Sequence, residues 1–387
     1  MITYTCLNPV SSLGLNRFSA DYAKTEELKD ADIALVRSAV MHDLTFPENL
    51  IAVARAGAGV NNIPLERCAD EGIVVFNTPG ANANGVKELV LAGMLLSARD
   101  IAGGIRWVEE NKEDENIAKS TEKAKKAFAG TEIAGKTLGV IGCGAIGVKI
   151  ANAALALGMD VLGYDAYFTL NNAHLLDPKV TMVSSVNDIY QNADYITIHV
   201  PANAATKGMI DKDAIALMKE NAVVLNFSRD VLVDEEAMVK ALEEGNIGRY
   251  VVDFPTPKTA GKKGCIVIPH LGASTAESED NCAVMAVDQI RDYVENGNIR
   301  NSVNYPALSM GVCTAAGRIA VLSKSSDTLV AVVTDAAASA GASITEICSK
   351  TRGEYAYTLI DLAAPADDKL QDALKAVPGV IRVRTIR

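Results

Sequence analysis

The sequence has no excess of basic residues, no long apolar run and only four histidines. Its 387 residues include 37 Lys and Arg against 48 Asp and Glu, which gives a net charge of -11 near neutral pH. Proteins that bind nucleic acid or anionic membranes usually present a basic surface, so this charge argues against both kinds of partner. No apolar run approaches the length needed to cross a bilayer, which argues against a membrane-spanning protein.

Cysteine patterns typical of disulfide frameworks or metal sites are also absent. The seven cysteines are scattered and show no C-x-x-C spacing, which is typical of reduced thiols in a cytoplasmic protein. We therefore expect no metal site. The first residues, MITYTCLNPV, lack the charged start, apolar segment and cleavage site of a signal peptide, which also favours a cytoplasmic location.

What is present indicates a globular α/β protein with two or three domains. Apolar residues make up 49% of the chain and charged residues 22%. In the first hundred residues, apolar strands such as IALVRSA (33–39) and GIVVFNTPG (72–80) alternate with helical stretches such as 87–105, which predicts β/α units around a parallel sheet. The charged segment 111–126 is interpreted as a solvated helical surface, although its lysines could instead reach a substrate in a neighbouring subunit.

A second series of strands and helices begins at Lys136. About six apolar strands, from TLGVIGCG to CIVIP, with helices between most of them, predict an open, doubly wound parallel sheet. The pattern changes after Pro306, where residues 318–387 follow the βαββαβ order of a ferredoxin-like domain. Residues 303–317 are the expected linker.

The hexapeptide GCGAIG at 142–147 fits the G-x-G-x-x-G pattern of a dinucleotide site. It follows an apolar strand and precedes a helix, and the next strand ends in Asp165. Gly142 would permit the tight turn, Gly144 the approach of a pyrophosphate, and Gly147 the close packing of helix on strand. Asp165 would bind the ribose hydroxyls and repel a 2′-phosphate, which predicts NAD rather than NADP. The alternative is a glycine-rich turn that binds no nucleotide.

Two further residues suit hydride transfer from a 2-hydroxy acid. Arg229 follows the strand VVLNFS, and a guanidinium can grip a carboxylate at two points. His270 follows the strand CIVIP, and an imidazole can take a hydroxyl proton near neutral pH. Both would lie at carboxyl ends of strands, where doubly wound folds bind ligands. For His270 a buried structural role is the alternative, and for His199 we expect a local structural role or a place in the cofactor cleft.

Four motifs together resemble those of the D-isomer-specific 2-hydroxyacid dehydrogenase family: LGVIGCGAIG with GYD, HVP with a following Thr, LNFSRD with VDEEA, and IPHLGAST. The likeness covers nearly the whole chain and is greatest to members that act on a phosphorylated 2-hydroxy acid. It implies a Rossmann-type NAD domain at 89–270, inserted in a flavodoxin-like substrate domain made of 1–88 and 271–302. Residues 318–387 would be an ACT-like domain for regulation or assembly, in a homodimer or homotetramer.

The resemblance also implies roles for individual residues. Arg229 would bind the substrate carboxylate, and His270 would be the acid/base. The phosphate end of the substrate would be held by Arg55, Gly57, Asn82 and Arg106. Besides the glycines and Asp165, the NAD site would include Thr78, Ala145, Ile146, Pro201, Thr206, Phe227, Ser228 and Asp253.

One departure from the family pattern concerns the acid/base. The family usually carries a glutamate between Asp253 and His270 that hydrogen-bonds the histidine, whereas this chain reads DFPTPK. Without that carboxylate, protonated His270 should be less stabilised. Four charged residues lie nearby in the sequence, but nothing in the sequence shows that any of them takes over the missing role: Lys258, Lys262, Lys263 and Glu277.

Two other departures concern a turn and the C-terminal domain. Asp230 stands where the family has glycine, so this turn should not need a positive φ. The serine-binding residues of related ACT domains are missing from 322–328 and 341–344, so we expect little serine binding. Two other functions stay open, namely a dehydrogenase of another 2-hydroxy acid and a non-catalytic protein that senses NAD(H).

Overall fold

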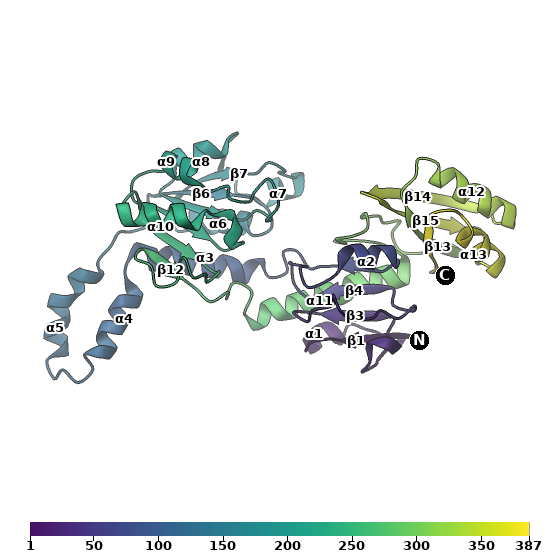
Figure 1. Ribbon diagram of the computed structural model, residues 1–387, viewed down its shortest axis with the longest axis horizontal. Coiled ribbons are helices and arrows are strands. Elements are labelled where there is room, and N and C mark those ends of the chain that lie inside the picture. Colours follow the sequence, from purple (N-terminus) through teal and green to yellow (C-terminus); the bar gives the residue numbers. More distant parts are fainter. Residues whose placement is uncertain (387) are drawn as a thin grey trace. The chain divides into compact units, whose positions relative to one another are not determined.

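The computed structural model describes residues 1–386, which form two compact units (Figure 1). Unit 1 contains Met1–Ala81 and the chain from Glu279 onward, and unit 2 contains Asn82–Ser278. The chain thus leaves unit 1, forms all of unit 2 and returns to unit 1. It crosses between the units at 81/82 and 278/279. The sequence analysis placed these crossings at 88/89 and 270/271 instead. No helix within the described residues has the length and apolar character to cross a membrane.

Unit 1 is built on a five-stranded parallel sheet in the order β2-β1-β3-β4-β5, the flavodoxin-like order. The strands are β1 (Ile2–Cys6), β2 (Tyr22–Lys24), β3 (Ile33–Val36), β4 (Ala52–Arg55) and β5 (Val74–Phe76). All of β3 is buried because its side chains enter cores on both faces, which explains its uninterrupted apolar sequence. The helices beside this sheet are α1 (Ser12–Leu15), η1 (Leu28–Asp30), α2 (Leu65–Asp70) and α11 (Ala276–Asn296).

The C-terminal part of unit 1 is an antiparallel sheet in the order β14-β15-β13-β16 with two helices. The predicted βαββαβ order is confirmed by β13 (Gly317–Lys324), α12 (Leu329–Ala340), β14 (Ile344–Arg352), β15 (Tyr355–Leu362), α13 (Asp368–Lys375) and β16 (Val380–Thr385). One face of the sheet is covered by α12 and α13. The other face shares a core with α11 and the first sheet, to which it contributes Ala320, Leu322, Tyr357 and Leu359.

Polar contacts also fix this C-terminal sheet to the rest of unit 1. Within the expected linker, buried Tyr305 donates a hydrogen bond to the Ala69 carbonyl at 2.7 Å. Buried Arg318 forms a two-point ion pair with Asp361, at 2.5 and 2.8 Å, and donates to the carbonyl of Asn296 at the end of α11. The C-terminal sheet is therefore an integral part of unit 1.

Unit 2 is a seven-stranded parallel sheet in the order β12-β11-β10-β9-β6-β7-β8. Its strands are β6 (Thr137–Ile141), β7 (Asp160–Tyr164), β8 (Thr181–Met182), β9 (Tyr195–Ile198), β10 (Ala222–Asn226), β11 (Ile247–Val252) and β12 (Cys265–Val267). This is the predicted doubly wound arrangement, and the chain reverses direction across the sheet between β6 and β9. Ligands of such sheets bind at the carboxyl ends of the strands beside this reversal.

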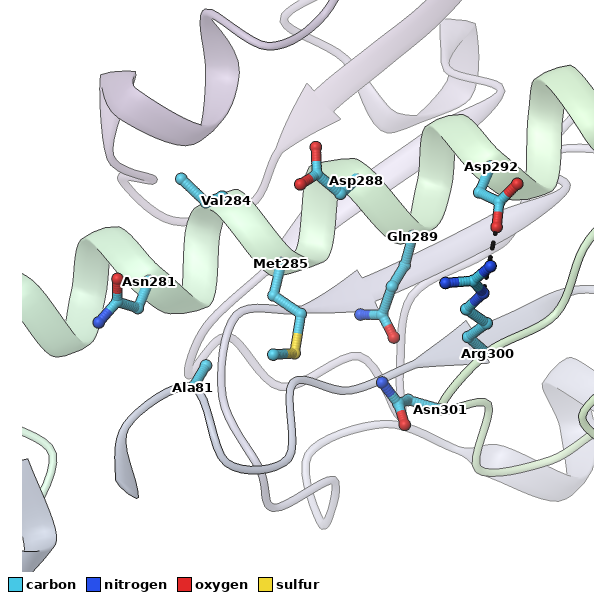
Figure 2. A pocket seen from close by; sticks show the side chains of 9 residues that line it. All are labelled: Ala81, Asn281, Val284, Met285, Asp288, Gln289, Asp292, Arg300 and Asn301. Atoms are coloured by element: carbon cyan, nitrogen blue, oxygen red, sulfur yellow. Dashed lines mark ion pairs between the residues drawn. The ribbon is translucent and has the colours of Figure 1, made fainter. Parts of the chain in front are cut away.

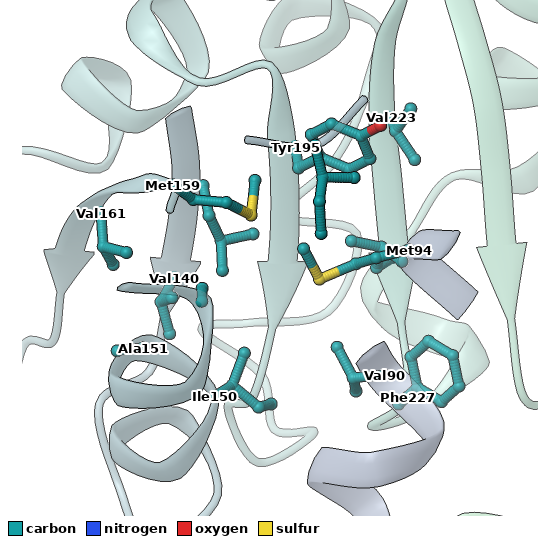
Figure 3. Packing of buried hydrophobic residues seen from close by; sticks show 14 of the residues in the cluster. Val90, Met94, Val140, Ile150, Ala151, Met159, Val161, Tyr195, Val223 and Phe227 are labelled. Atoms are coloured by element: carbon teal, nitrogen blue, oxygen red, sulfur yellow. The ribbon is translucent and has the colours of Figure 1, made fainter. Parts of the chain in front are cut away.

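Helices cover both faces of the unit 2 sheet. One face packs against α3 (Ala83–Ala98) and α6 (Gly147–Ala156). Figure 3 shows Met94 of α3 between the sheet residues Tyr195 and Val223, and Val90 of α3 beside Phe227. The opposite face packs against α8 (Val186–Asn192), α9 (Lys212–Leu217) and α10 (Glu235–Glu244). The remaining short elements are α7 (Leu170–Leu175) and η3 (Asp230–Leu232).

Two helices of unit 2 form an exposed arm, visible in Figure 1 as α4 (Ile101–Glu110) and α5 (Ile117–Ala124), followed by η2 (Lys125–Phe128). None of the arm's helical residues is buried. The charged segment 111–126 lies on this arm, as its interpretation as a solvated helical surface predicted.

Candidate functional site

The glycine-rich turn joins β6 to α6 at the carboxyl end of the unit 2 sheet. Gly142 has a φ of +95°, and a Cβ atom there would lie 2.5 Å from the His199 carbonyl oxygen. Gly147 packs so closely on the Gly142 carbonyl that no Cβ would fit. A Cβ at Gly144 would meet nothing within 4 Å, so the backbone there borders open space. The turn thus has the bend and the open backbone that a bound pyrophosphate needs.

A cavity of about 860 Å³ lies beside this turn. Five of the predicted cofactor residues line it: Gly142, Gly144, Asp165, Pro201 and Thr206. Its wall also contains residues that were not among the predicted site residues, chiefly Tyr164, Tyr167, Val200, Asn203, Met209 and Leu217. The wall is largely apolar and carries Asp165 at the end of β7, besides Asp211 and Asp213. An apolar wall with a carboxylate at this strand end suits the adenosine half of a dinucleotide, so these residues fit the implied NAD.

Two local hydrogen bonds shape the wall of this cavity. One oxygen of Asp165 accepts the Tyr167 amide at 2.7 Å, which ties the end of β7 to the following turn. The Thr206 hydroxyl donates to the Pro201 carbonyl at 2.5 Å and closes the loop after β9. In the sequence, Tyr164 and Tyr167 lie close to Asp165 on either side. This spacing is the sequence signal that could have predicted aromatic residues in the cavity wall at the end of β7.

His199 lies in the same wall with its ring nitrogens turned away from solvent. Its Nε2 is 2.8 Å from the Thr197 hydroxyl, and its buried Nδ1 has no hydrogen-bond partner among residues 1–386. Desolvation of the ring lowers the pKa of His199 to about 3. His199 is therefore neutral at physiological pH and does not act as a proton carrier there.

Arg229 and His270 lie at the same edge of the unit 2 sheet. The strands β10, β11 and β12 are parallel neighbours, with Asn226 beside Val252 and Val252 beside Val267. Arg229 follows β10 and His270 follows β12, so both side chains start from the carboxyl edge that also carries the glycine turn. Parallel pairing thus gathers residues that are distant in the sequence.

Phe254, directly after β11, contacts both of these residues. The ring centroids of Phe254 and His270 are 4.7 Å apart with the planes tilted by 50°, and Arg229 Cζ lies 5.7 Å from the Phe254 centroid. Within residues 1–386, no carboxylate oxygen lies within 4.0 Å of the Arg229 guanidinium or of the His270 ring nitrogens. Arg229 is exposed, so its cation can receive an anionic group.

Asp253 holds the backbone of the His270 loop and does not line the cavity. Its two oxygens accept the amides of Leu271 and Gly272, each at 2.8 Å. Burial raises the pKa of the Asp253 carboxyl, while these amide donors act in the opposite direction. His270 itself has a φ of +54°, a conformation uncommon outside glycine. Asp253 thus fixes the residues that follow a strained histidine.

The structure also bears on two departures in the sequence. Asp230 begins the short helix η3 and has no positive φ, as expected for a turn without glycine. Lys258, one candidate for the missing role beside His270, pairs with Glu236 at 2.7 Å. Lys258 is therefore engaged by α10.

The other predicted residues of unit 2 have varied surroundings. Phe227 is buried in the core shown in Figure 3, and the Ser228 hydroxyl donates to the Ile198 carbonyl at 2.7 Å. Asn82 precedes α3, and Arg106 is exposed on α4. The predicted residues of the glycine turn outside the cavity are Ala145, Ile146 and Gly147.

Three predicted residues lie together in unit 1, at the carboxyl ends of β4 and β5. The Arg55 side chain donates from Nε to the Arg37 carbonyl at 2.8 Å. The Gly57 amide donates to the Arg55 carbonyl at 2.9 Å, and the Thr78 amide donates to the Gly57 carbonyl at 3.0 Å. Backbone contacts therefore hold a basic residue beside a glycine-rich loop.

Unit 1 also has a cavity of about 480 Å³ along α11 (Figure 2). Its lining includes Asp288, Gln289, Asp292 and Arg300, and Figure 2 shows the Arg300–Asp292 ion pair, which measures 3.4 Å. None of the predicted site residues lines it. Its charged side chains already have partners, since Asp288 pairs with Arg17.

Comparisons with known proteins support this reading of unit 2. The family model described as "D-isomer specific 2-hydroxyacid dehydrogenase, NAD binding domain" matches residues 91–272. A D-3-phosphoglycerate dehydrogenase of Methanocaldococcus jannaschii is 36% identical over 290 residues, which cover 73% of this chain and 53% of that protein. This chain thus spans about half the length of the first curated relatives it matches.

Two further matches cover most of the matched protein. A hydroxypyruvate reductase of Thermotoga maritima is 34% identical over 275 residues, which cover 68% of this chain and 85% of that protein. The NAD+-bound 3-phosphoglycerate dehydrogenase of Entamoeba histolytica superposes with a TM-score of 0.62 at 25% identity, covering 79% of this chain and 99% of that one. The chain therefore belongs to the D-isomer specific 2-hydroxyacid dehydrogenase family, with its NAD-binding domain in unit 2.

Proposed function

We propose that this chain is a D-3-phosphoglycerate dehydrogenase, which oxidises 3-phospho-D-glycerate to 3-phosphohydroxypyruvate with NAD in the cytoplasm. This reaction is the first step of the phosphorylated route to L-serine. The observation that carries the proposal is the convergence of Arg229 and His270 on Phe254, at the sheet edge that bears the glycine turn. Oxidation of a 2-hydroxy acid needs a carboxylate grip and a proton acceptor beside a dinucleotide site.

The residues of unit 2 supply the positioning and the proton chemistry. The glycine turn and Asp165 would hold NAD, which accepts the hydride when bound. Arg229, which has no carboxylate partner in the described chain, binds the substrate carboxylate and so fixes the orientation of C2. Neutral His270 accepts the hydroxyl proton as the C2 hydrogen departs with its electron pair, and the products are a ketone, NADH and protonated His270.

The choice of a phosphorylated substrate is supported by unit 1 and by the named relatives. The Arg55 guanidinium lies beside the loop of Gly57 and Thr78, where it donates to the carbonyls of Arg37 and Gly59, and guanidinium groups bind phosphate well. The M. jannaschii and E. histolytica relatives carry the name of this activity.

The test is NADH formation at 340 nm with 3-phosphoglycerate, D-glycerate or D-lactate, each with NAD or NADP, for wild type and His270→Ala. We expect a preference for the phosphorylated acid and for NAD. The rate of His270→Ala should fall by roughly a hundredfold or more, because general base catalysis contributes about that much. Equal rates with all three acids would contradict the substrate, and an unchanged His270→Ala rate would contradict the proton acceptor.

A second function is favoured by the T. maritima relative, which is named a hydroxypyruvate reductase. The same site would then reduce an unphosphorylated 2-keto acid with NADH. Faster NADH consumption with hydroxypyruvate or glyoxylate than with 3-phosphohydroxypyruvate would select this function. Tight NADH binding without turnover of any acid would instead select a sensor of NAD(H).

We also propose that the chain forms a homodimer through the arm, which ACT-like pairing could extend to a homotetramer. The arm exposes Ile101, Ile105 and Val108 on α4. Clustered apolar side chains that are this exposed usually mark a surface that a partner covers. We expect Ile105→Asp to shift the mass from a dimer or tetramer toward a smaller species in sedimentation equilibrium. Lys119→Asp on α5 is the exposed control, and an unchanged mass in Ile105→Asp would contradict the interface.

A further inference from the structure

The His270 ring lacks the carboxylate partner that a histidine acid/base often has. An imidazole that moves protons is usually oriented by a hydrogen bond that one of its ring N–H groups donates to a carboxylate or carbonyl oxygen. Within residues 1–386, no carboxylate oxygen lies within 4.0 Å of its ring nitrogens. Within residues 1–386, the His270 amide donates to the Ile268 carbonyl, and the His270 carbonyl accepts the Ser274 hydroxyl. Among residues 1–386, no carboxylate therefore orients the ring through a direct contact.

We propose that Phe254 is a positioning residue that orients both His270 and Arg229, in place of the carboxylate that this chain lacks. This inference rests on the proposed hydride-transfer function. The Phe254 ring is 4.7 Å from the His270 ring and 5.7 Å from Arg229 Cζ. An aromatic face attracts a guanidinium at this range, and it attracts a protonated imidazole in the same way. One ring thus sets the spacing between the carboxylate-binding group and the proton acceptor.

The backbone on the amino side of Phe254 is rigidly held. Asp253 precedes it, is almost fully buried, and accepts hydrogen bonds from Leu271 and Gly272. These two amides directly follow His270. Asp253 therefore joins the loop that carries Phe254 to the loop that carries His270.

The carboxyl side of Phe254 is held by a buried acid on α10. The Thr256 hydroxyl donates to Glu235 Oε2 at 2.6 Å and lies 3.1 Å from the Thr259 hydroxyl. The Phe254 ring itself is half-buried against the core formed with α10. With both flanks anchored, the ring has little freedom to move away from His270.

The nearby charged side chains are engaged elsewhere. Glu235 accepts the Thr256 hydroxyl, and Lys258 pairs with Glu236 at 2.7 Å. Neither forms a hydrogen bond or ion pair with the His270 ring. The aromatic contact is therefore the interaction that distinguishes the surroundings of His270 in this chain.

The experiment compares Phe254→Leu, which keeps an apolar side chain without a ring, with Phe254→Tyr, which keeps the ring. Phe168→Leu, at another half-buried position of unit 2, is the matched control. The first measurement needs no cofactor or substrate. It follows the His270 imidazole C–H resonance by NMR, assigned with His270→Asn, because the neighbouring ring shifts that resonance. The second is kcat and KM for the best substrate of the wild type.

We expect the His270 resonance to move in Phe254→Leu and to stay near its wild-type position in Phe254→Tyr and Phe168→Leu. The kcat of Phe254→Leu should fall by roughly tenfold to a hundredfold, since small misplacements of reacting groups cost about that much. KM for NAD should not change, and Phe254→Tyr should regain most of the rate. A wild-type kcat in Phe254→Leu, or an unmoved resonance, would overturn the proposal. A wild type that turns over no acid would sink the proposed function instead, and the NMR comparison would still decide the contact.

Discussion

At the scale of single residues, two histidines of unit 2 show how surroundings select the chemistry of a side chain. His199 follows β9 with both ring nitrogens inside the protein, whereas His270 follows β12 on an exposed turn. The His199 ring stays neutral near pH 7 because its burial lowers its pKa. The second is exposed to solvent at an edge where a substrate can reach it, so only His270 suits proton transfer.

The burial of the neutral His199 ring predicts that the free energy of unfolding depends on pH. The pKa of His199 is lowered to about 3 in the folded chain, against about 6.5 in an unfolded one. Between these values only the unfolded chain gains the proton, so stability is complete above about pH 6.5 and is lost as the pH falls toward 3. We expect this one group to cost at most about 2 kcal/mol at pH 5.

Urea unfolding of wild type and His199→Gln at pH 7 and pH 5 measures this cost. The variant should lose less stability between the two pH values, while the exposed control His174→Gln should behave like wild type. Equal losses in wild type and His199→Gln would show that the buried ring is not responsible.

The sequence anticipated part of the site at this scale. Strand ends and motif spacing predicted that Arg229, His270 and the glycine turn would share one edge of the sheet, because parallel strands bring their carboxyl ends together. The role of Asp253 in holding amides, and the position of Phe254 between the two candidates, were not predictable in this way. Both depend on the loop conformation after β11, which has no periodic pattern.

At the scale of helices and strands, the periodic segments were predictable, but the sheet against which the whole of α3 packs was not. Apolar runs identified the parallel strands, and the C-terminal βαββαβ order was confirmed. The helix α3 packs on the unit 2 sheet from its first turn, since Ala83 and Val86 are buried, so the division between the units falls before it. A sequence shows that a helix has an apolar face, but it does not show which sheet that face will cover.

The same limit applies to the C-terminal sheet. Its strands were recognised, but its second apolar face was not assigned a partner. In the structure that face meets Val287, Ile290 and Tyr293 of α11 in one core. Such contacts join segments far apart in the chain, and no local pattern encodes them.

At the scale of the whole molecule, this shared core predicts the outcome of removing residues 306–387. The truncation would uncover the α11 residues of the shared core and delete the Arg318–Asp361 pair. Each large apolar side chain that loses its cover costs roughly 1.5–3 kcal/mol. Proteins are stable by only about 5–15 kcal/mol, so we expect unit 1 of the truncated chain to unfold or aggregate.

Thermal unfolding by circular dichroism and solubility after expression test this expectation, with unit 2 alone (82–278) as the comparison. A soluble truncated chain that melts within a few degrees of the full chain would contradict it. The expected absence of serine regulation should therefore be examined by titrating serine into the full chain, because loss of a serine effect on truncation would be confounded by unfolding.

The burial of both faces of the C-terminal sheet limits how two copies could join through it. The helices α12 and α13 occupy one face and α11 the other, while Arg382 on β16 donates to the carbonyls of Leu50 and Glu71. The opposite edge of the sheet is β14, whose exposed residues include Glu346 and Lys350, while Arg352 donates to the Ser302 carbonyl at 2.6 Å. Dimerisation by this domain would thus extend the hydrogen-bond ladder into a continuous sheet across the symmetry axis, with charge complementarity along β14 deciding whether it forms.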